Sequence, residues 1–285
     1  MLFVIIGGAS GSGKTGLSHQ LLAKLQKDGI SAQLLNMDDY YHEIPEGRNL
    51  EDYRKNTNFD TPDMLHLDLL QEHIAELNHG KSIKKPLFDF KSNLRNGEET
   101  VHPTDVIIME GIFAQYFYKK YGVSELPVVT VNIATENYTD VIERRIKRDI
   151  EQRGRIRIDS IKQEKKYVGP GFLKYTANSA TGADVYINNE HREGNAEQQL
   201  MLDNAANEIL TVLNEKRLEL ESGKPLSKKP CPKVQEVVAK SHLRAGTLFH
   251  PRKFEGYFSG VFTDFKGNYV REFSEEEIKE AQLTP

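Results

Sequence analysis

Cysteine is almost missing from this sequence: Cys231 is the one cysteine among 285 residues. A single thiol cannot form a disulfide within the chain, which fits a reducing compartment. Long apolar runs are missing as well. The stretch LFVII near the N-terminus is too short for the core of a signal peptide, and no run approaches the length of a membrane span. These absences predict a cytoplasmic protein that does not enter a membrane.

A strong charge of either sign is also lacking, because the formal net charge is -4. No overall positive field therefore indicates nucleic acid or an anionic membrane surface as a partner. Hydrophobic residues make up 38% of the chain and charged residues 28%, which is typical of soluble globular proteins. The length suits one large α/β domain, with or without a small appendage.

Short apolar segments alternate with segments of helical periodicity along most of the chain. Strand candidates are residues 2–6, 31–37, 105–110, 127–133 and 183–189, and residues 82–90 are expected to be extended. Helix candidates are residues 15–27, 62–78, 138–152 and 197–213, whereas residues 38–61 are expected to be irregular. Short apolar strands that alternate with helices predict an α/β fold, a parallel sheet with helices on both faces.

The composition changes near Glu215, where a charged segment with three prolines begins. Such a segment is typical of a linker. Beyond it, the pattern predicts a β-hairpin around residues 266–268 and a helix with a capping box of Ser274 and Glu277. We therefore expect a main domain over residues 1–215 and a linker with a small hairpin-and-helix appendage over residues 216–285.

The glycines that follow the first strand have a specific pattern. They match G-x-x-x-x-G-K-[ST], the P-loop, and the match lies between a predicted strand and a predicted helix, as this motif requires. Its backbone N–H groups and the N-terminus of the helix favour bound phosphate. The residues offered to the nucleotide are Gly8, Ala9, Ser10, Gly11, Ser12, Gly13, Lys14 and Thr15. Lys14 is expected to reach the β- and γ-phosphates, and the Thr15 hydroxyl to bind Mg²⁺.

Three carboxylates are candidates for the rest of a site. Asp38 directly follows the second strand, at the sheet edge where ligands bind, so it can take a proton from an attacking hydroxyl or simply stabilise a turn. Asp60 precedes Thr61 and Pro62, and can serve a ligand or cap a helix. Glu110 ends an apolar strand, where an acid is either solvated or linked to a metal through water.

Arginines gather in one basic helix and just after it. Arg145 and Arg148 share a helix face at a spacing of three residues, and Arg153 and Arg155 flank Gly154. A basic helix face is usually solvated surface. The second pair is also typical of a mobile lid that brings cations to a transferring phosphoryl group. We place this lid around residues 153–182.

The order and spacing of these segments resemble the uridine–cytidine kinase family, within the larger group that contains phosphoribulokinase and pantothenate kinase. The resemblance covers residues 3–189, about two-thirds of the chain. It implies a P-loop NTPase-type sheet, ATP as phosphate donor, Mg²⁺, a nucleoside-like small-molecule substrate and a homo-oligomer.

The resemblance also implies roles for individual residues. Asp38 matches the catalytic base that activates a nucleoside 5′-hydroxyl, Asp60 the carboxylate that holds the ribose hydroxyls, and Glu110 the acid that joins Thr15 around Mg²⁺. The catalytic set is then Lys14, Asp38, Arg148 and Arg153, and Arg153 also contacts the nucleotide. The other positions on the substrate side are Tyr41, Arg145, Arg155 and Gln163.

Two positions depart from the family pattern. Phe88 stands where the family has a tyrosine that lies against the pyrimidine, and Asn93 stands where it has a histidine that hydrogen-bonds the base. Phe88 can still stack on a base. Asn93 offers both a donor and an acceptor to a base edge. Both are therefore candidate substrate-binding residues with altered chemistry.

Three functions fit these observations. The first is ATP-dependent phosphorylation of the 5′-hydroxyl of uridine or cytidine, a step of pyrimidine salvage. The second is a related small-molecule kinase with a different hydroxyl acceptor, which the changes at Phe88 and Asn93 favour. The third is a nucleotide-dependent switch that uses the appendage to bind partners. Asp38 argues against the switch, because a switch needs no base for an alcohol.

Overall fold

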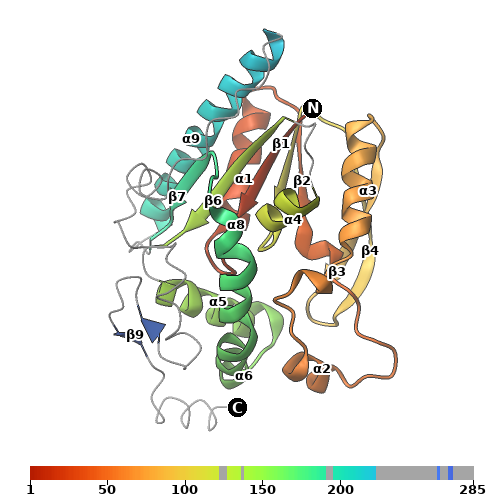
Figure 1. Ribbon diagram of the computed structural model, residues 1–285, viewed down its shortest axis with the longest axis vertical. Coiled ribbons are helices and arrows are strands. Elements are labelled where there is room, and N and C mark those ends of the chain that lie inside the picture. Colours follow the sequence, from red (N-terminus) through yellow and green to blue (C-terminus); the bar gives the residue numbers. More distant parts are fainter. Residues whose placement is uncertain (122–126, 136–137, 191–194, 223–261, 264–268, 272–285) are drawn as a thin grey trace.

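The computed structural model describes residues 1–121, 127–135, 138–190 and 195–222, together with residues 262–263 and 269–271 (Figure 1). Its central sheet has five parallel strands in the order β2-β5-β1-β6-β7. Their bounds are β1 Leu2–Gly7, β2 Ala32–Asn36, β5 Val106–Glu110, β6 Val128–Ala134 and β7 Val185–Asn188. β1 lies between β5 and β6, with Phe3 opposite Ile107 and Val128. The predicted parallel sheet is confirmed.

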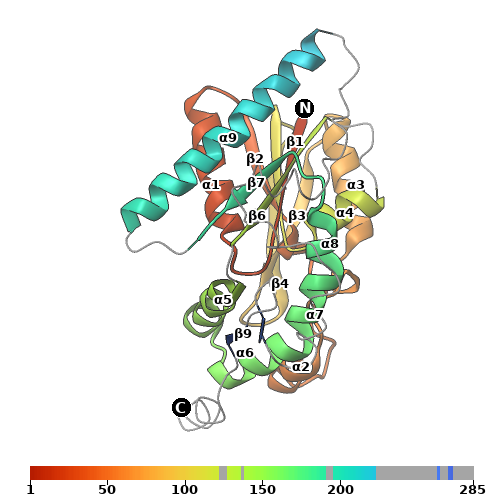
Figure 2. The ribbon, with the colours of Figure 1, turned by 60° about the vertical axis from the view of Figure 1, so that its left-hand side comes forward.

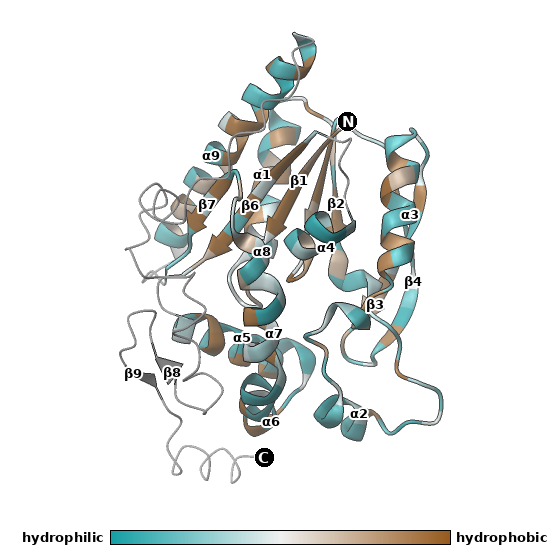
Figure 3. Ribbon diagram, in the orientation of Figure 1, coloured by the Kyte–Doolittle hydropathy of each residue, from teal (hydrophilic) through white to brown (hydrophobic). Residues whose placement is uncertain are grey.

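Alternating side chains of β1 enter two separate cores. Leu2, Val4 and Ile6 pack with leucines of α1 (Lys14–Lys27) and with the buried face of α9 (Asn195–Glu221). Phe3 and Ile5 pack on the opposite face, with α3 (Leu67–Asn78) and α4 (Ala114–Tyr121). Figure 2 shows these helix pairs on opposite sides of the sheet, and Figure 3 shows the hydrophobic strands between them. The prediction of helices on both faces is therefore confirmed.

Two predictions about the segment after β2 are wrong. Residues 38–61 are not wholly irregular, because a 3₁₀ turn spans Met37–Tyr40 and α2 spans Leu50–Asn56. One helix over residues 62–78 does not form either. A 3₁₀ turn at Pro62–Met64 ends before α3 begins, because Leu65 is extended and forms a β-bridge with Tyr41.

A hairpin stands apart from the main sheet. β3 (Ile83–Asp89) confirms the extended segment and pairs antiparallel with β4 (Leu94–Val101). Neither β4 nor α4 is predicted by the sequence pattern. Most of β4 is exposed and polar, so it lacks the apolar residues that identify a strand from sequence.

The predicted basic helix is α5 (Tyr138–Arg153), and the chain after it is helical again from residue 157 to residue 180. This lid segment consists of α6 (Arg157–Gln163), α7 (Gly169–Gly171) and α8 (Asn178–Ala180), joined by π-helical turns at Glu164–Val168 and Phe172–Ala177. α2, α5 and α6 lie beyond the carboxyl ends of the strands, whereas α8 lies beside α4 along the sheet (Figures 1 and 2). This arrangement encloses the edge of the sheet at which the P-loop lies.

The last long helix passes the expected domain boundary at Glu215. α9 continues to Glu221, and its Lys216 ammonium lies 3.7 Å from the Asp184 carboxylate. Further on, β8 (Phe262–Thr263) and β9 (Tyr269–Arg271) pair antiparallel, as the hairpin prediction requires. Residues 266–268 and the helix expected after Ser274 lie outside the described residues. Among the helices that are described, none has the length and apolar character needed to cross a membrane.

Candidate active site

The P-loop joins β1 to α1 and has the backbone that its glycines predict. Gly11 and Gly13 have φ values of 93° and 99°, which residues with a Cβ rarely adopt. A Cβ at Gly13 would overlap the side-chain amide of Asn189. That amide donates to the Ser12 carbonyl at 2.7 Å, from the end of β7. Asn189 therefore supports the loop, although no sequence pattern singled it out.

Lys14 and Thr15 lie where the motif predicts. The Lys14 ammonium donates to the Ala9 carbonyl at 2.9 Å, which holds it over the loop. Burial lowers the Lys14 pKa, and the nearby Glu110 and Asp38 carboxylates oppose this effect. The Thr15 hydroxyl donates to Glu110 Oε1 at 2.8 Å. Glu110 is thus a buried partner of the P-loop rather than a solvated acid, and burial raises its pKa.

The Thr15 and Glu110 oxygens suit Mg²⁺, which prefers hard oxygen ligands. The described residues contain no group of three or more His, Cys, Asp or Glu side chains that could hold a metal by themselves. Mg²⁺ usually binds to one or two protein oxygens together with phosphate oxygens and water. The donor set therefore fits Mg²⁺ that arrives with a nucleotide.

The two aspartates after β2 have different surroundings. Asp39 faces the hairpin, where its carboxylate accepts from the Lys85 ammonium and from the Phe88 N–H at 3.3 Å. Asp38 faces the cavity beside the P-loop, and its backbone N–H donates to Asn36 Oδ1 at 3.0 Å. The structure therefore leaves Asp38, the residue chosen from sequence, available to a ligand, and commits Asp39 to the fold.

One cavity brings together most of the predicted substrate-binding residues. Its walls come from the P-loop, the segment after β2, the hairpin, α5 and the lid segment. The residues that line it are Ser10, Asp38, Tyr41, Phe59, Asp60, Phe90, Ile112, Arg145, Arg148, Asp149, Arg153, Arg155 and Gln163. Phe59, Phe90, Ile112 and Asp149 were not predicted. Each of the four lies within or next to a sequence motif in which another residue was the predicted site residue.

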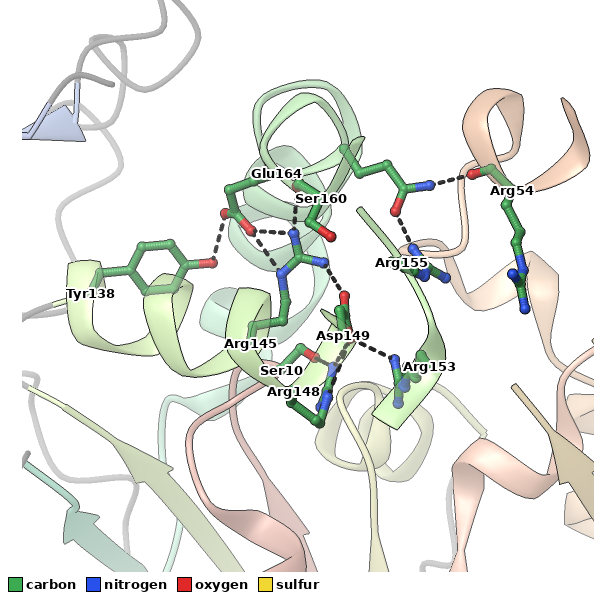
Figure 4. A network of polar contacts seen from close by, with 11 residues as sticks. Ser10, Arg54, Tyr138, Arg145, Arg148, Asp149, Arg153, Arg155, Ser160 and Glu164 are labelled. Carbon is green, nitrogen blue, oxygen red and sulfur yellow. Dashed lines mark hydrogen bonds and ion pairs between the residues drawn. The ribbon is translucent and has the colours of Figure 1, made fainter. Parts of the chain in front are cut away.

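Asp149 is the centre of a buried cluster of charges (Figure 4). Its carboxylate lies 3.2 Å from Arg145, 3.0 Å from Arg148 and 3.3 Å from Arg153. Burial alone would raise the pKa of Asp149, but the arginines around it lower that pKa instead. These arginines are therefore not a solvated helix face. The signal in the sequence is the spacing of four residues on each side of Asp149 along α5.

Two of these arginines have further partners. Arg148 donates to the Ser10 hydroxyl at 3.1 Å, which joins α5 to the P-loop. Arg145 is 4% exposed, and it pairs with the buried Glu164 carboxylate at 3.1 Å and donates to the Ser160 carbonyl at 3.0 Å. Arg145 thus forms part of the cavity wall while it holds the lid segment. Glu164 was not predicted.

Asp60 lies under the lid segment and is not a helix cap. The 3₁₀ turn that follows begins with Thr61 as its N-cap, and no side chain caps it. A Cβ at Gly171 would lie 2.8 Å from the Asp60 Cβ, so the lid can approach this closely because residue 171 is glycine. Burial raises the pKa of Asp60 to about 6, while Arg145 opposes this effect. Asp60 is therefore a half-buried acid that lines the cavity.

The two altered positions do not line this cavity. Phe88 packs against the Tyr41 and Phe90 rings, with centroids 5.7 and 5.1 Å apart. Phe90 is the ring in the wall, and the Arg153 guanidinium lies 4.0 Å from its centroid. Asn93 is 1% exposed and accepts from Arg54 Nε at 3.0 Å. The structure thus places Phe88 behind Tyr41 and turns Asn93 toward Arg54.

Comparisons with known proteins show the family of this chain. The model of the Phosphoribulokinase / Uridine kinase family matches residues 3–196. The chain is 38% identical over 192 residues to a uridine kinase of Brevibacillus brevis, which covers 65% of this chain and 84% of the relative. It is 32% identical over 216 residues to a uridine kinase of Ligilactobacillus salivarius, covering 75% and 95%.

A solved structure supports the fold. It is that of a kinase assigned to a fructose transport system from Silicibacter sp. TM1040, with a TM-score of 0.52 and 21% identity. The match covers 65% of this chain and 88% of that chain. At this identity the likeness concerns the arrangement of strands and helices alone.

Proposed function

The chain belongs to the Phosphoribulokinase / Uridine kinase family, and on that premise we propose that it phosphorylates the 5′-hydroxyl of uridine or cytidine with ATP. It is a phosphotransferase that acts on an alcohol group. This activity argues against a role as a nucleotide-dependent switch. Pyrimidine salvage, a cytoplasmic location and a homo-oligomer are part of the same proposal.

The observation that carries the proposal is the cavity that Asp38 and Asp60 share with the P-loop residue Ser10. Phosphoryl transfer requires positioning, neutralisation of charge and an oriented hydroxyl. Asp38 lies where it can accept the proton of the attacking hydroxyl. Asp60 lies under the lid, where it can accept hydrogen bonds from the other sugar hydroxyls.

Positive charges lie in the wall of the same cavity and at the P-loop beside it. Lys14 is held over the P-loop, and Arg148 is fixed to Ser10. Arg153 lies between Asp149 and Phe90 in the cavity wall, from which it could contact a nucleotide and an acceptor. Thr15 and Glu110 would hold Mg²⁺, which supplies further positive charge to the phosphates when it is bound. These groups favour the charge that develops on the transferring phosphoryl group.

A second candidate is a kinase of the same group with an anionic hydroxyl acceptor. Gln163 donates to the Arg54 carbonyl and accepts from Arg155, so both ends of its amide are engaged. Asn93 is engaged by Arg54. The remaining donors in the wall include Arg153 and Arg155, and arginine binds carboxylate and phosphate well. This observation favours an acceptor that carries such a group.

An ADP-release assay with Mg-ATP separates the two candidates. The panel contains uridine, cytidine, purine nucleosides, nicotinamide riboside, ribulose 5-phosphate, pantothenate and glycerate, with the Asp38→Asn variant as control. We expect turnover of uridine or cytidine that the variant loses. Turnover of an anionic acceptor without turnover of pyrimidine nucleosides would replace the first candidate by the second.

A further inference from the structure

Helix α2 has no part in the mechanism above, yet it contacts three walls of the cavity. Its Tyr53 ring packs edge-on against Phe59, with centroids 5.4 Å apart. Its Arg54 side chain reaches the hairpin, and the Arg54 carbonyl accepts from Gln163 of the lid segment. Phe59, Phe90 and Gln163 come from separate segments of the chain and all line the cavity. α2 is therefore the element through which these walls are joined.

The Arg54 guanidinium closes the tip of the hairpin. It donates to the carbonyls of Phe90 and Lys91 at 2.8 and 2.6 Å, and to Asn93 Oδ1 at 3.0 Å. Asn93 has a φ of 56°, a left-handed conformation that asparagine tolerates better than most residues. The turn thus directs several oxygen atoms at one cation. Since Phe90 is held through its own carbonyl, Arg54 fixes the ring that lines the cavity.

On the lid side, the contact runs through an amide that is itself part of the cavity wall. Gln163 Nε2 donates to the Arg54 carbonyl, and Gln163 Oε1 accepts from Arg155. Arg155 also lies above the Phe59 ring, with its guanidinium 5.8 Å from the ring centroid. A second contact joins the lid to α2, because the Tyr167 hydroxyl donates to the Asn56 carbonyl at 3.1 Å.

We propose that Arg54 is a positioning residue for the acceptor: it couples the hairpin tip to the lid, and so sets the separation of Phe90 from Gln163 and Arg155. This inference rests on the proposed function in one respect, that the cavity holds the acceptor. Asn93 then serves the fold by fixing Arg54, and the acceptor is selected by the walls that Arg54 holds in place.

The first test compares Arg54→Ala with Glu51→Ala, an exposed residue of the same helix whose ion pair with Lys55 stays within α2. Hydrogen bonds from a charged donor are strong enough that Arg54→Ala should raise the acceptor KM about tenfold or more. The KM for ATP should not change, because no P-loop residue contacts Arg54 among the described contacts. Glu51→Ala should keep both values.

Variants of Asn93 separate positioning from direct contact with the acceptor. Asn93→Asp keeps an oxygen for Arg54 but loses the amide donor, whereas Asn93→Gly keeps the left-handed backbone but loses the oxygen. The proposal expects a larger rise in acceptor KM for Asn93→Gly than for Asn93→Asp. The opposite order would show that the amide itself reads the acceptor, and would overturn the assignment.

Hydrogen exchange tests the coupling without any acceptor. Gln163→Leu should speed amide exchange in residues 90–95, and Arg54→Ala should speed it in residues 157–168, with residues 8–15 unchanged in both. If these changes occur while the wild-type protein phosphorylates neither uridine nor cytidine, the coupling stands and the proposed function fails. If exchange stays local to each substitution, or if Arg54→Ala raises both KM values equally, Arg54 is a structural residue and the inference is wrong.

Discussion

The phosphate side of the cavity and the acceptor side are built in different ways. The phosphate side is one continuous stretch, residues 8–15, with Glu110 added from the neighbouring strand β5. The acceptor side takes Asp38, Phe59, Phe90 and Gln163 from four segments far apart in sequence. The first is fixed by local backbone geometry, and the second by contacts between segments. We therefore expect substitutions on the two sides to differ in their effects on kcat, KM and stability.

The largest effect should come from the phosphate side, with Lys14→Ala. Loss of a charge that stabilises a transferring phosphoryl group costs about 10³-fold or more in kcat. The melting temperature should stay close to that of the wild type, since the Lys14 ammonium bonds one carbonyl of its own loop. Steady-state kinetics and thermal unfolding measure the two quantities. Retention of kcat within tenfold would contradict this role.

The next effect should come from the acceptor side, with Asp38→Asn. Loss of a general base typically costs about 10²–10⁴-fold in rate, and ATP affinity should be unchanged. Asp39→Asn is the matched control, because it breaks the contacts to Lys85 and Phe88 instead. It should lower stability more than kcat. If Asp39→Asn instead lost kcat and Asp38→Asn lost stability, the general base would be Asp39.

A smaller effect, on the KM for the acceptor, is expected from Asp60 on the acceptor side. Its pKa is about 6, so the acceptor KM should fall as pH rises through 6 and ionised Asp60 becomes available to hydroxyl donors. Asp60→Asn should remove this step and raise the acceptor KM at neutral pH. A pH profile of KM for both substrates measures it. If the KM for ATP changed in the same way near pH 6, Asp60 would not act on the acceptor alone.

The same residue gives a stability prediction with a definite sign. The folded pKa of about 6 lies above the ordinary value of 3.8, so the native state binds this proton more tightly than the unfolded state. The stability that Asp60 contributes is complete below its ordinary pKa and is lost as pH rises through 6. Asp60→Asn should thus stabilise the protein at neutral pH by up to about 3 kcal/mol, and little in acid. Urea unfolding of the wild type and of Asp60→Asn, at neutral pH and in acid, measures this difference in stability.

The smallest effect on chemistry should follow truncation after Ser222. Among the described residues, all those that line the cavity lie between Ser10 and Gln163. We propose that residues 1–215, which include most of α9, form the kinase domain, and that the appendage serves stability or assembly. The truncated protein should keep its kcat and change in oligomeric state or melting temperature. A folded but inactive truncation would show that the appendage completes the site.

The same contrast explains how far the sequence predicts this molecule. The P-loop, its strand and its helix were predicted because backbone pattern alone specifies them. Asp38 and Asp60 were predicted because they follow a strand or precede a turn, whereas Tyr41 was implied only by the family resemblance. The placement of Phe88 and Asn93 depends on the exposed strand β4 and on Arg54 across the hairpin tip. Such contacts between distant segments leave no periodic signal in the sequence.

The order of strands in the sheet has a consequence for synthesis of the protein on the ribosome. β1 is made before both of its neighbours in the sheet, β5 and β6, which end at Glu110 and Ala134. At typical elongation rates the nascent chain needs on the order of ten seconds to span that interval. The glycine-rich loop must therefore leave the ribosome long before the strands beside it exist. Co-translational folding begins late here, and apolar β1 is meanwhile a natural client for a chaperone.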